Sequence, residues 1–149
     1  ALTTFVSQNR GAKEYERAKK GAHFGLVCSV SLAETIGVLI ALFATPLMRL
    51  FVDDPQVRQY GVERAHYATI LFFLLAYSHG VSAVLRGVGK SVVPMVVMLV
   101  CWCLVRVTLL TMLNMLFHNI LFVYLIYPFT WSLSSIVFFL YYRKINWQE

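Results

Sequence analysis

Two ionisable side chains lie inside long apolar runs of this sequence, Glu34 in the first run and Arg106 in the third. Charges inside a membrane are costly, so they commonly mark an ion or substrate pathway, a proton relay or a buried pair. Counted from the first residue of each run, Glu34 lies ~18 Å deep and Arg106 ~21 Å deep, at about 1.5 Å per residue. The similar depths and opposite charges favour a structural pair. The functional alternative is that Glu34 binds a coupling ion or a cationic substrate.

A second group of polar side chains lies in the second apolar run, where Tyr77, Ser78, His79 and Ser82 follow one another closely. They could line a polar cavity, in which the imidazole of His79 would change its protonation near neutral pH. The alternative is that the small residues serve close packing between helices, with His79 near the inner interface. We favour the packing interpretation.

A third group follows Pro128 in the fourth run, and Pro128 itself should kink a helix or free a carbonyl. Small polar residues spaced three or four apart usually form hydrogen bonds between membrane helices, and an aromatic substrate wall is the alternative. This group consists of Tyr127, Thr130, Trp131, Ser132, Ser134 and Ser135. Together, the candidate residues for a substrate or ion pathway are Glu34, Arg106, Tyr77, His79, Tyr127 and Trp131.

The elements that must position these residues are four apolar runs, at about residues 22–45, 67–85, 92–117 and 119–142. Hydrophobic residues make up 59% of the chain and charged residues 13%, whereas a soluble domain has about 45–50% and about 25%. Each run is near or above the ~20 residues that a helix needs to cross a bilayer. The sequence therefore predicts an all-α membrane protein with four transmembrane helices, and the lipid bilayer is its first partner.

The basic residues are distributed unevenly between the connections. Nine of the 13 Lys and Arg residues precede the first run, separate the second from the third, or follow the fourth; three lie in the other connections, and one is Arg106. This is the positive-inside pattern. It predicts that residues 7–21, 86–91 and 143–149 face the cytoplasm, with both ends of a multi-pass protein on that side. The net charge of +6 then reflects topology and contact with anionic headgroups, so we expect no nucleic-acid partner.

The connections carry signals of their own. Residues 7–21 predict a loop at Asn9–Gly11 followed by a short amphipathic helix on the cytoplasmic surface. Asp53 or Asp54 should cap the next helix, with Pro55 in its first turn. We therefore divide the chain into residues 1–21, the end of a preceding helix and a basic loop, and residues 22–149, the four-helix transmembrane part.

The motifs of common enzymes are missing from this sequence. It has no P-loop, no G-x-S-x-G, no H-E-x-x-H and no pair of histidines at metal-ligand spacing. Glu34 is the one acid inside an apolar run. A mechanism that uses two carboxylates within the runs is therefore not available. We expect neither catalysis nor a metal or organic cofactor.

Three stretches resemble the C-terminal half of multidrug and toxic compound extrusion (MATE) transporters. They are ALTTFVSQNRGAKEYERAKKG, AYSHGVSAVLRGVGKSVVPM and YPFTWSLSSIVFFLYY, and the most specific part is LRGVGKSVVPM. The resemblance implies a parent of 12 helices in two lobes, of which this chain supplies the end of helix 8 and helices 9–12. It implies export of organic cations and other xenobiotics across the plasma membrane, in exchange for Na⁺ or H⁺. The missing N-terminal helices would be its partners.

The chain departs from this family's pattern in two places. Lys13 stands where family members often have Gly, and residues 67–85 hold no Asp or Glu, which argues against a sodium site in this lobe. We expect a fragment that does not transport alone. Two alternatives stay open: a lipid-linked oligosaccharide flippase of the same superfamily, and a four-helix membrane scaffold.

Overall fold

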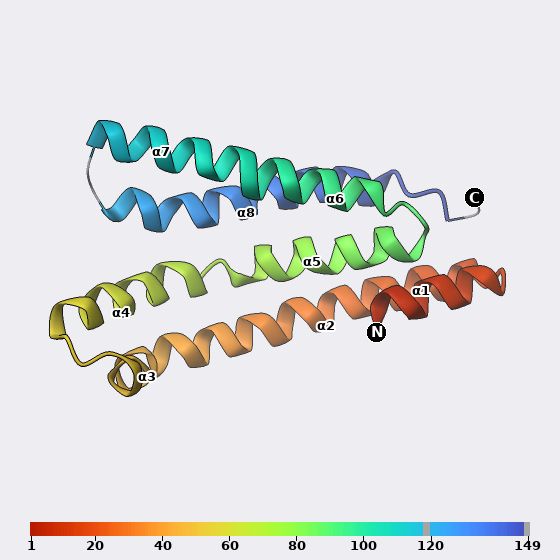
Figure 1. The fold of residues 1–149 in the computed structure, drawn as a ribbon. Helices are drawn as coiled ribbons and strands as arrows, with labels where there is room; N and C mark the ends of the chain where they lie inside the picture. The colour runs from red at the N-terminus through yellow and green to blue at the C-terminus, as the bar shows by residue number, and fades with distance from the viewer. Residues whose placement is uncertain (118–119, 148–149) are drawn as a thin grey trace.

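The chain folds into an elongated bundle of helices (Figure 1). A computed structural model describes residues 1–117 and 120–147, and every regular element in these ranges is helical. This confirms the predicted all-α class. The elements are α1 (Leu2–Gly11), α2 (Tyr15–Leu42), α3 (Ala44–Phe51), α4 (Pro55–Thr69), α5 (Phe72–Gly87), α6 (Val92–Met98), the π-helix η1 (Leu99–Val105), α7 (Arg106–Phe117) and α8 (Ile120–Arg143).

Three helical stretches are long and apolar enough to cross a membrane: Tyr15–Leu42, Val92–Leu116 and Phe122–Arg143. The helices α4 and α5 meet at a bend of 57° and count as one further span if they are taken together. The predicted second run, residues 67–85, crosses this break. The described part of the chain thus has three such spans, or up to four with the bent pair.

The basic segment near the N-terminus is part of a long helix. Its predicted form, a loop at Asn9–Gly11 and a separate short helix, is wrong, because α1 continues to Gly11 and α2 runs unbroken from Tyr15. The turn lies between them, where Lys13 adopts a positive φ of 62°. No proline interrupts residues 15–42, so the polar turns and the apolar span form one helix.

The predicted cap before Pro55 is confirmed, and a glycine forms the next turn but one. The Asp54 carboxylate accepts hydrogen bonds from the backbone N–H groups of Gln56 at 2.8 Å and Val57 at 3.3 Å, and Pro55 is the first residue of α4. Between α5 and α6, Gly89 has a φ of +83°, which glycine adopts at little cost. These two turns fix where α4 begins and where α5 ends.

The core lies where α1, α2, α5 and α8 pack together. Its buried side chains come from all four helices and include Val6, Leu26, Leu85 and Phe138. At Gly87 the α1 and α5 backbones are so close that an added Cβ would lie 2.9 Å from the Thr3 carbonyl oxygen. Small residues permit this approach, which is typical of membrane helix pairs.

The π-helix η1 shifts the face that the chain presents to α8. Val97 before it and Cys101 within it are buried; after it, Arg106 bonds α8, and Leu109 lines a groove shared with α8. An uninterrupted α-helix would continue the stripe of Val97 and Cys101 at Val105 instead of Arg106. A π-turn closes an i→i+5 hydrogen bond, so it holds one residue more than an α-turn. Arg106, like Trp102 one turn earlier, then faces α8.

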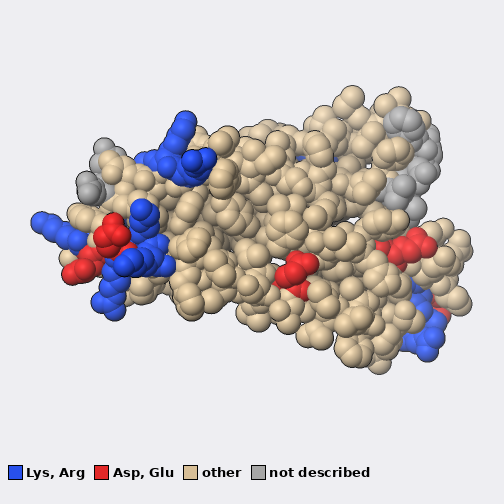
Figure 2. All heavy atoms as spheres, turned by 180° about the vertical axis from the view of Figure 1, so that it is seen from behind, with Lys and Arg blue, Asp and Glu red and all other residues tan. Residues whose placement is uncertain are grey.

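Charged side chains gather at the ends of the molecule and leave the middle largely apolar (Figure 2). The turn between α1 and α2, the turn between α5 and α6 and the C-terminal end of α8 lie at one end of the bundle (Figure 1). Nine of the basic residues lie in these connections or in the helix ends beside them. Their assignment to the cytoplasm remains our prediction from the positive-inside pattern.

Candidate functional site

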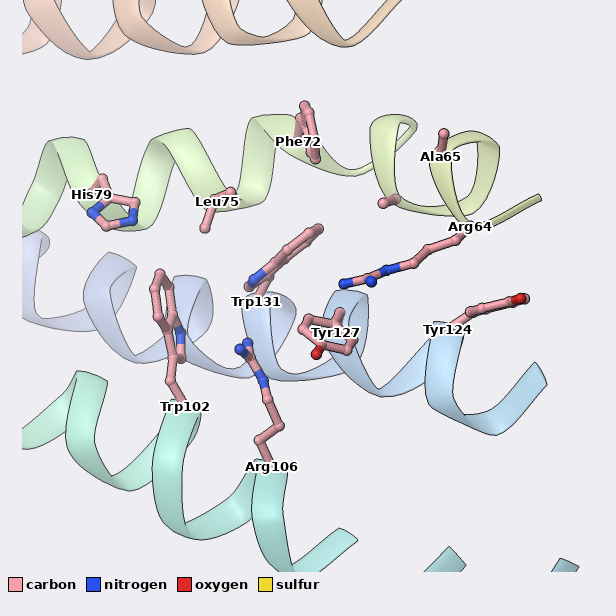
Figure 3. Close-up of a pocket in the computed structure, with 11 residues that line it drawn as sticks. Arg64, Ala65, Phe72, Leu75, His79, Trp102, Arg106, Tyr124, Tyr127 and Trp131 are labelled. Carbon is pink, nitrogen blue, oxygen red and sulfur yellow. The ribbon is translucent and has the colours of Figure 1, made fainter. Parts of the chain in front are cut away.

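A cavity of about 520 Å³ opens between the α4–α5 pair, η1, α7 and α8. Its walls are mainly aromatic, with two arginines and one histidine among them (Figure 3). The lining residues are Arg64, Ala65, Ala68, Phe72, Leu75, His79, Trp102, Arg106, Tyr124, Tyr127 and Trp131. The volume falls within the ~300–1,000 Å³ typical of small-molecule pockets.

The aromatic walls contain two groups of ring contacts. The Trp131 ring meets Phe72 edge-on at 6.0 Å and Tyr127 at 6.4 Å between centroids, and His79 meets Trp102 at 5.2 Å. Such edge-to-face pairs contribute about 0.5–1.5 kcal/mol each beyond the area they bury. The walls therefore hold their shape without a ligand.

Arg106 projects from the start of α7 into this cavity (Figure 3). Its Nε donates to the Thr130 hydroxyl at 3.1 Å, and one terminal nitrogen donates to the same oxygen at 2.7 Å. The guanidinium carbon lies 4.6 Å from the Tyr127 ring centroid and 5.5 Å from that of Trp102. Contacts between a cation and an aromatic face partly replace the lost hydration of this charge.

A second arginine reaches the same aromatic ring from the opposite wall. Arg64 comes from α4, and its guanidinium carbon lies 5.1 Å from the centroid of Tyr127. The neighbouring acid, Glu63, accepts a hydrogen bond from the side chain of Gln59 at 3.1 Å and does not line the cavity. The lining set thus contains two guanidinium groups and no carboxylate.

Serines join α5 to α8 beside the cavity. The Ser78 hydroxyl lies 3.1 Å from that of Ser134 and 2.9 Å from that of Ser135, and all three are buried. The Trp102 indole N–H also donates to Ser134, at 3.2 Å. The prediction that small polar residues bond helices together is confirmed, and the aromatic residues interleaved with them line the cavity.

Glu34 lies elsewhere, at the break in the bent helix pair. Its carboxylate accepts a hydrogen bond from the backbone N–H of Phe73 at 3.1 Å. The expected pair between Glu34 and Arg106 is therefore wrong, since Arg106 has Thr130 and two rings as its partners. Similar depth and opposite charge led to that pairing, whereas α2 packs on α5 and α7 packs on α8.

The remaining candidates divide between two sides of α5. The cavity brings together His79, Arg106, Tyr127 and Trp131. Tyr77 lines a separate groove, with residues of α2 and α8 such as Leu26 and Phe139. Within residues 1–117 and 120–147, no group of three His, Cys, Asp or Glu side chains is placed to hold a metal ion.

Sequence reasoning missed seven lining residues, of which four are charged or aromatic: Arg64, Phe72, Trp102 and Tyr124. A usable signal existed for two of them, because Trp102 lies one helical turn before Arg106 and Tyr124 one turn before Tyr127. No local signal marks Arg64, which belongs to a polar stretch far from Arg106 in sequence. The bend between α4 and α5 brings it to the cavity.

Helices of membrane-spanning length and a largely aromatic, ligand-sized cavity define a helical membrane protein with an internal cavity. The MatE family model matches residues 1–112. The chain belongs to the MatE family, as the resemblance in its turns indicated.

Curated relatives agree with this assignment. Two proteins named "Probable multidrug resistance protein NorM" are each 30% identical to the chain: that of Thermotoga maritima over 97 residues, and that of Aromatoleum aromaticum over 102 residues. The matches cover 65% and 68% of this chain and 21% and 22% of the relatives. A third protein of that name, from Chromobacterium violaceum, is 27% identical over 65% of the chain and 21% of its own length. The chain thus spans about a fifth of the length of these relatives.

Proposed function

We propose that this chain is part of a secondary active efflux transporter of the plasma membrane, which exports organic cations and other xenobiotics in exchange for Na⁺ or H⁺. The observation that carries the proposal is the MatE match over residues 1–112. The multidrug resistance named for its relatives supports the same activity. Export needs binding and conformational change rather than bond chemistry, so the proposal includes no enzymatic step.

The geometry supports a binding role within a larger pathway. The cavity lies between helices, where transporters commonly hold their substrates. Helices beyond this chain, in a two-lobed parent of 12, would complete the pathway. Glu34, the one acid inside an apolar run of the sequence, is the candidate for contact with the coupling ion.

One observation favours a second candidate. Two arginines in the cavity would suit the phosphates of a lipid-linked oligosaccharide, the substrate of flippases. The MatE match supports efflux over this alternative. A scaffold without transport would need neither the cavity nor its fixed aromatic walls.

Ethidium efflux from a drug-sensitive host that lacks its own pumps tests the proposal. Expressed together with the missing N-terminal helices of its parent, the chain should lower intracellular ethidium, and collapsing the gradient of the coupling ion, Na⁺ or H⁺, with a specific ionophore should abolish the effect. Expressed alone, the chain should not lower it. Trp131→Ala, which opens the cavity wall, should cut the efflux rate several-fold. Phe129→Ala is the matched control, because Phe129 lies on the same helix outside the cavity. Efflux that survives collapse of both gradients would exclude antiport.

A further inference from the structure

We propose that a groove between α2, α5 and α8 binds one acyl chain of an anionic phospholipid, whose phosphate contacts Lys20 and Arg143. The groove lies on the other side of α5 from the aromatic cavity. The lipid belongs to the leaflet at the basic end of the bundle. This site goes beyond the proposed efflux function and does not depend on it.

The length of the groove is the first argument. It consists of two adjoining cavities of about 310 Å³ and 470 Å³, which share Val30, Tyr77 and Phe139. Along α8 the groove extends from Tyr142 to Ser132, which is about 15 Å at 1.5 Å per residue. One leaflet supplies half of the ~30 Å hydrocarbon core of a bilayer. The groove therefore has the length of one acyl chain.

The apolar character of its deep part is the second argument. The two serines there are turned to backbone, because Ser132 donates to the Pro128 carbonyl and Ser135 to the Leu74 carbonyl, each at 2.9 Å. Apart from Tyr77, the other side chains that line this part are aliphatic or aromatic hydrocarbons. A polar ligand would lose its hydrogen bonds to water here and gain few in return. Such walls favour a hydrocarbon chain.

Basic side chains at one end of the groove are the third argument. The guanidinium carbon of Arg143 lies 5.7 Å from the ring centroid of Phe139, which lines the groove. Lys19 and Lys20 lie about one helical turn before His23, which lines the same part. All three cations are at the end of the bundle where α2 begins and α8 ends (Figure 1). Basic pockets at such a level bind anionic lipid headgroups.

The order of the side chains matches the order of the parts of a phospholipid. Lys20 and Arg143 lie at the end, Tyr142 comes next, and Val30 and Ile136 lie deeper. Within residues 1–117 and 120–147, the Lys20 and Arg143 side chains have no hydrogen bond or ion pair, and the Tyr142 hydroxyl has no hydrogen-bond partner. A phosphate can accept from both cations, and an ester carbonyl can accept from the phenol. One lipid molecule supplies both acceptors and the chain.

Photo-crosslinking with two lipids tests the proposal. The chain, expressed together with the missing N-terminal helices of its parent, is placed in phosphatidylcholine nanodiscs that contain a trace of photoreactive lipid. The two probes carry the same diazirine in the middle of one acyl chain and have a phosphatidylglycerol or a phosphatidylcholine headgroup. Mass spectrometry then locates the adducts. We expect the phosphatidylglycerol probe to label residues 27–30 and 136–139 about tenfold more strongly. Equal labelling by the two probes would overturn the proposal.

Charge variants separate this site from a general attraction of anionic lipid to a basic surface. Lys20→Gln combined with Arg143→Gln should lower phosphatidylglycerol labelling of the groove to the level of phosphatidylcholine. Arg86→Gln combined with Lys90→Gln removes the same charge at the same end of the molecule, outside the groove, and should label like the wild type. An equal loss in both double variants would reduce the effect to surface charge and refute the site.

A bulky side chain in the groove tests where the acyl chain lies. Val30→Trp fills the point where the two cavities meet and should lower labelling of residues 136–139 several-fold. Leu32→Trp is the control, because Leu32 lies at a similar depth on α2, is 63% exposed and does not line the groove. Wild-type labelling in Val30→Trp would place the lipid elsewhere. The exposed charges of the Lys20→Gln and Arg143→Gln variant give an independent check if tryptophan disturbs the packing.

A transporter helix outside this chain is the other occupant that the groove could take. Such a helix would exclude both probes, so a groove that neither probe labels would overturn the proposal. The labelling is measured without transport, which separates it from the proposed function. Groove labelling without any efflux would refute the proposed function alone, whereas efflux without groove labelling would refute this inference alone.

Discussion

Glu34 shows how one side chain can hold a broken membrane helix. The first N–H groups of a helix have no partner within it, and in a membrane no water can replace one. At the start of α5 the cap residue Leu71 offers no side-chain acceptor, and the Glu34 carboxylate from α2 binds the N–H of Phe73 instead. The acid therefore has a structural partner that its sequence position did not reveal.

Replacing Glu34 separates this structural role from ion coupling. Glu34→Leu removes the acceptor and should lower the free energy of unfolding by about 1–3 kcal/mol. Glu34→Gln keeps a carbonyl oxygen at the same position and should unfold close to the wild-type temperature. Thermal unfolding in nanodiscs, followed by circular dichroism, measures both.

Transport by the same variants then tests the coupling role. If Glu34→Gln folds normally and still pumps ethidium with an intact ion dependence, Glu34 serves only the helix break. Normal folding with lost ion dependence would make it a coupling residue. Equal stability of Glu34→Leu and wild type would contradict the structural role.

At the scale of elements, α1 and α5 are held together by a close backbone approach. The Thr3 hydroxyl donates to the Ala83 carbonyl at 3.0 Å, and the Arg10 side chain donates to the Val88 carbonyl at the end of α5. Gly87 lies between these contacts and leaves no room for a side chain. The packing of α1 against α5 is therefore sensitive to a single methyl group added at Gly87.

Gly87→Ala tests this packing. The added Cβ would lie 2.8 Å from the Val6 Cβ, and backbone must move to admit it. Overpacking of this kind costs about 1–3 kcal/mol, so the unfolding temperature should fall. Gly11→Ala is the matched control, because Gly11 also ends a helix and has no atom within 4 Å of the added group. A Gly87→Ala protein as stable as the control would refute the close approach.

Elements could be predicted where a local cause exists. Apolar runs predicted the helices, and Asp54, Pro55 and Gly89 marked turns through their own chemistry. The break at residues 70–71 has no such mark, because neither glycine nor proline occurs there and the bend depends on Glu34 from another helix. The π-helix likewise has no local signature. His79 and Trp131 could be identified as candidates from their own residue types. Their position in one cavity with Arg64 depends on the packing of helices that are distant in sequence, so it could not be predicted.

The whole molecule is organised along its length, with charges at its ends and an apolar middle (Figure 2). Nine basic residues share one end, and the positive-inside pattern predicts that this end faces the cytoplasm. The connections at that end are those that the sequence analysis assigned to one side of the membrane because of their basic residues. The orientation of the cavity mouth relative to the cell follows from this assignment.

Cysteine labelling in intact cells tests the orientation. In a variant without its three native cysteines, Ser91→Cys should react with a membrane-impermeant maleimide only after the cells are permeabilised. Asp53→Cys, in the turn between α3 and α4 at the other end, is the control and should react at once. Both positions are exposed in the structure. The reverse labelling pattern would invert the topology.

The π-helix has a consequence for comparing this chain with its homologues. Its surplus residue can be lost by deleting one position within residues 99–105, such as Leu104, which turns the segment into an ordinary α-helix. Arg106 would then continue the stripe of Val97 and Cys101 and still face α8. A deletion further along, in α7, would instead rotate everything beyond it by about 100°. An alignment gap at residues 99–105 therefore marks a change of helix type, and a homologue one residue shorter there can keep the same arginine in the same cavity.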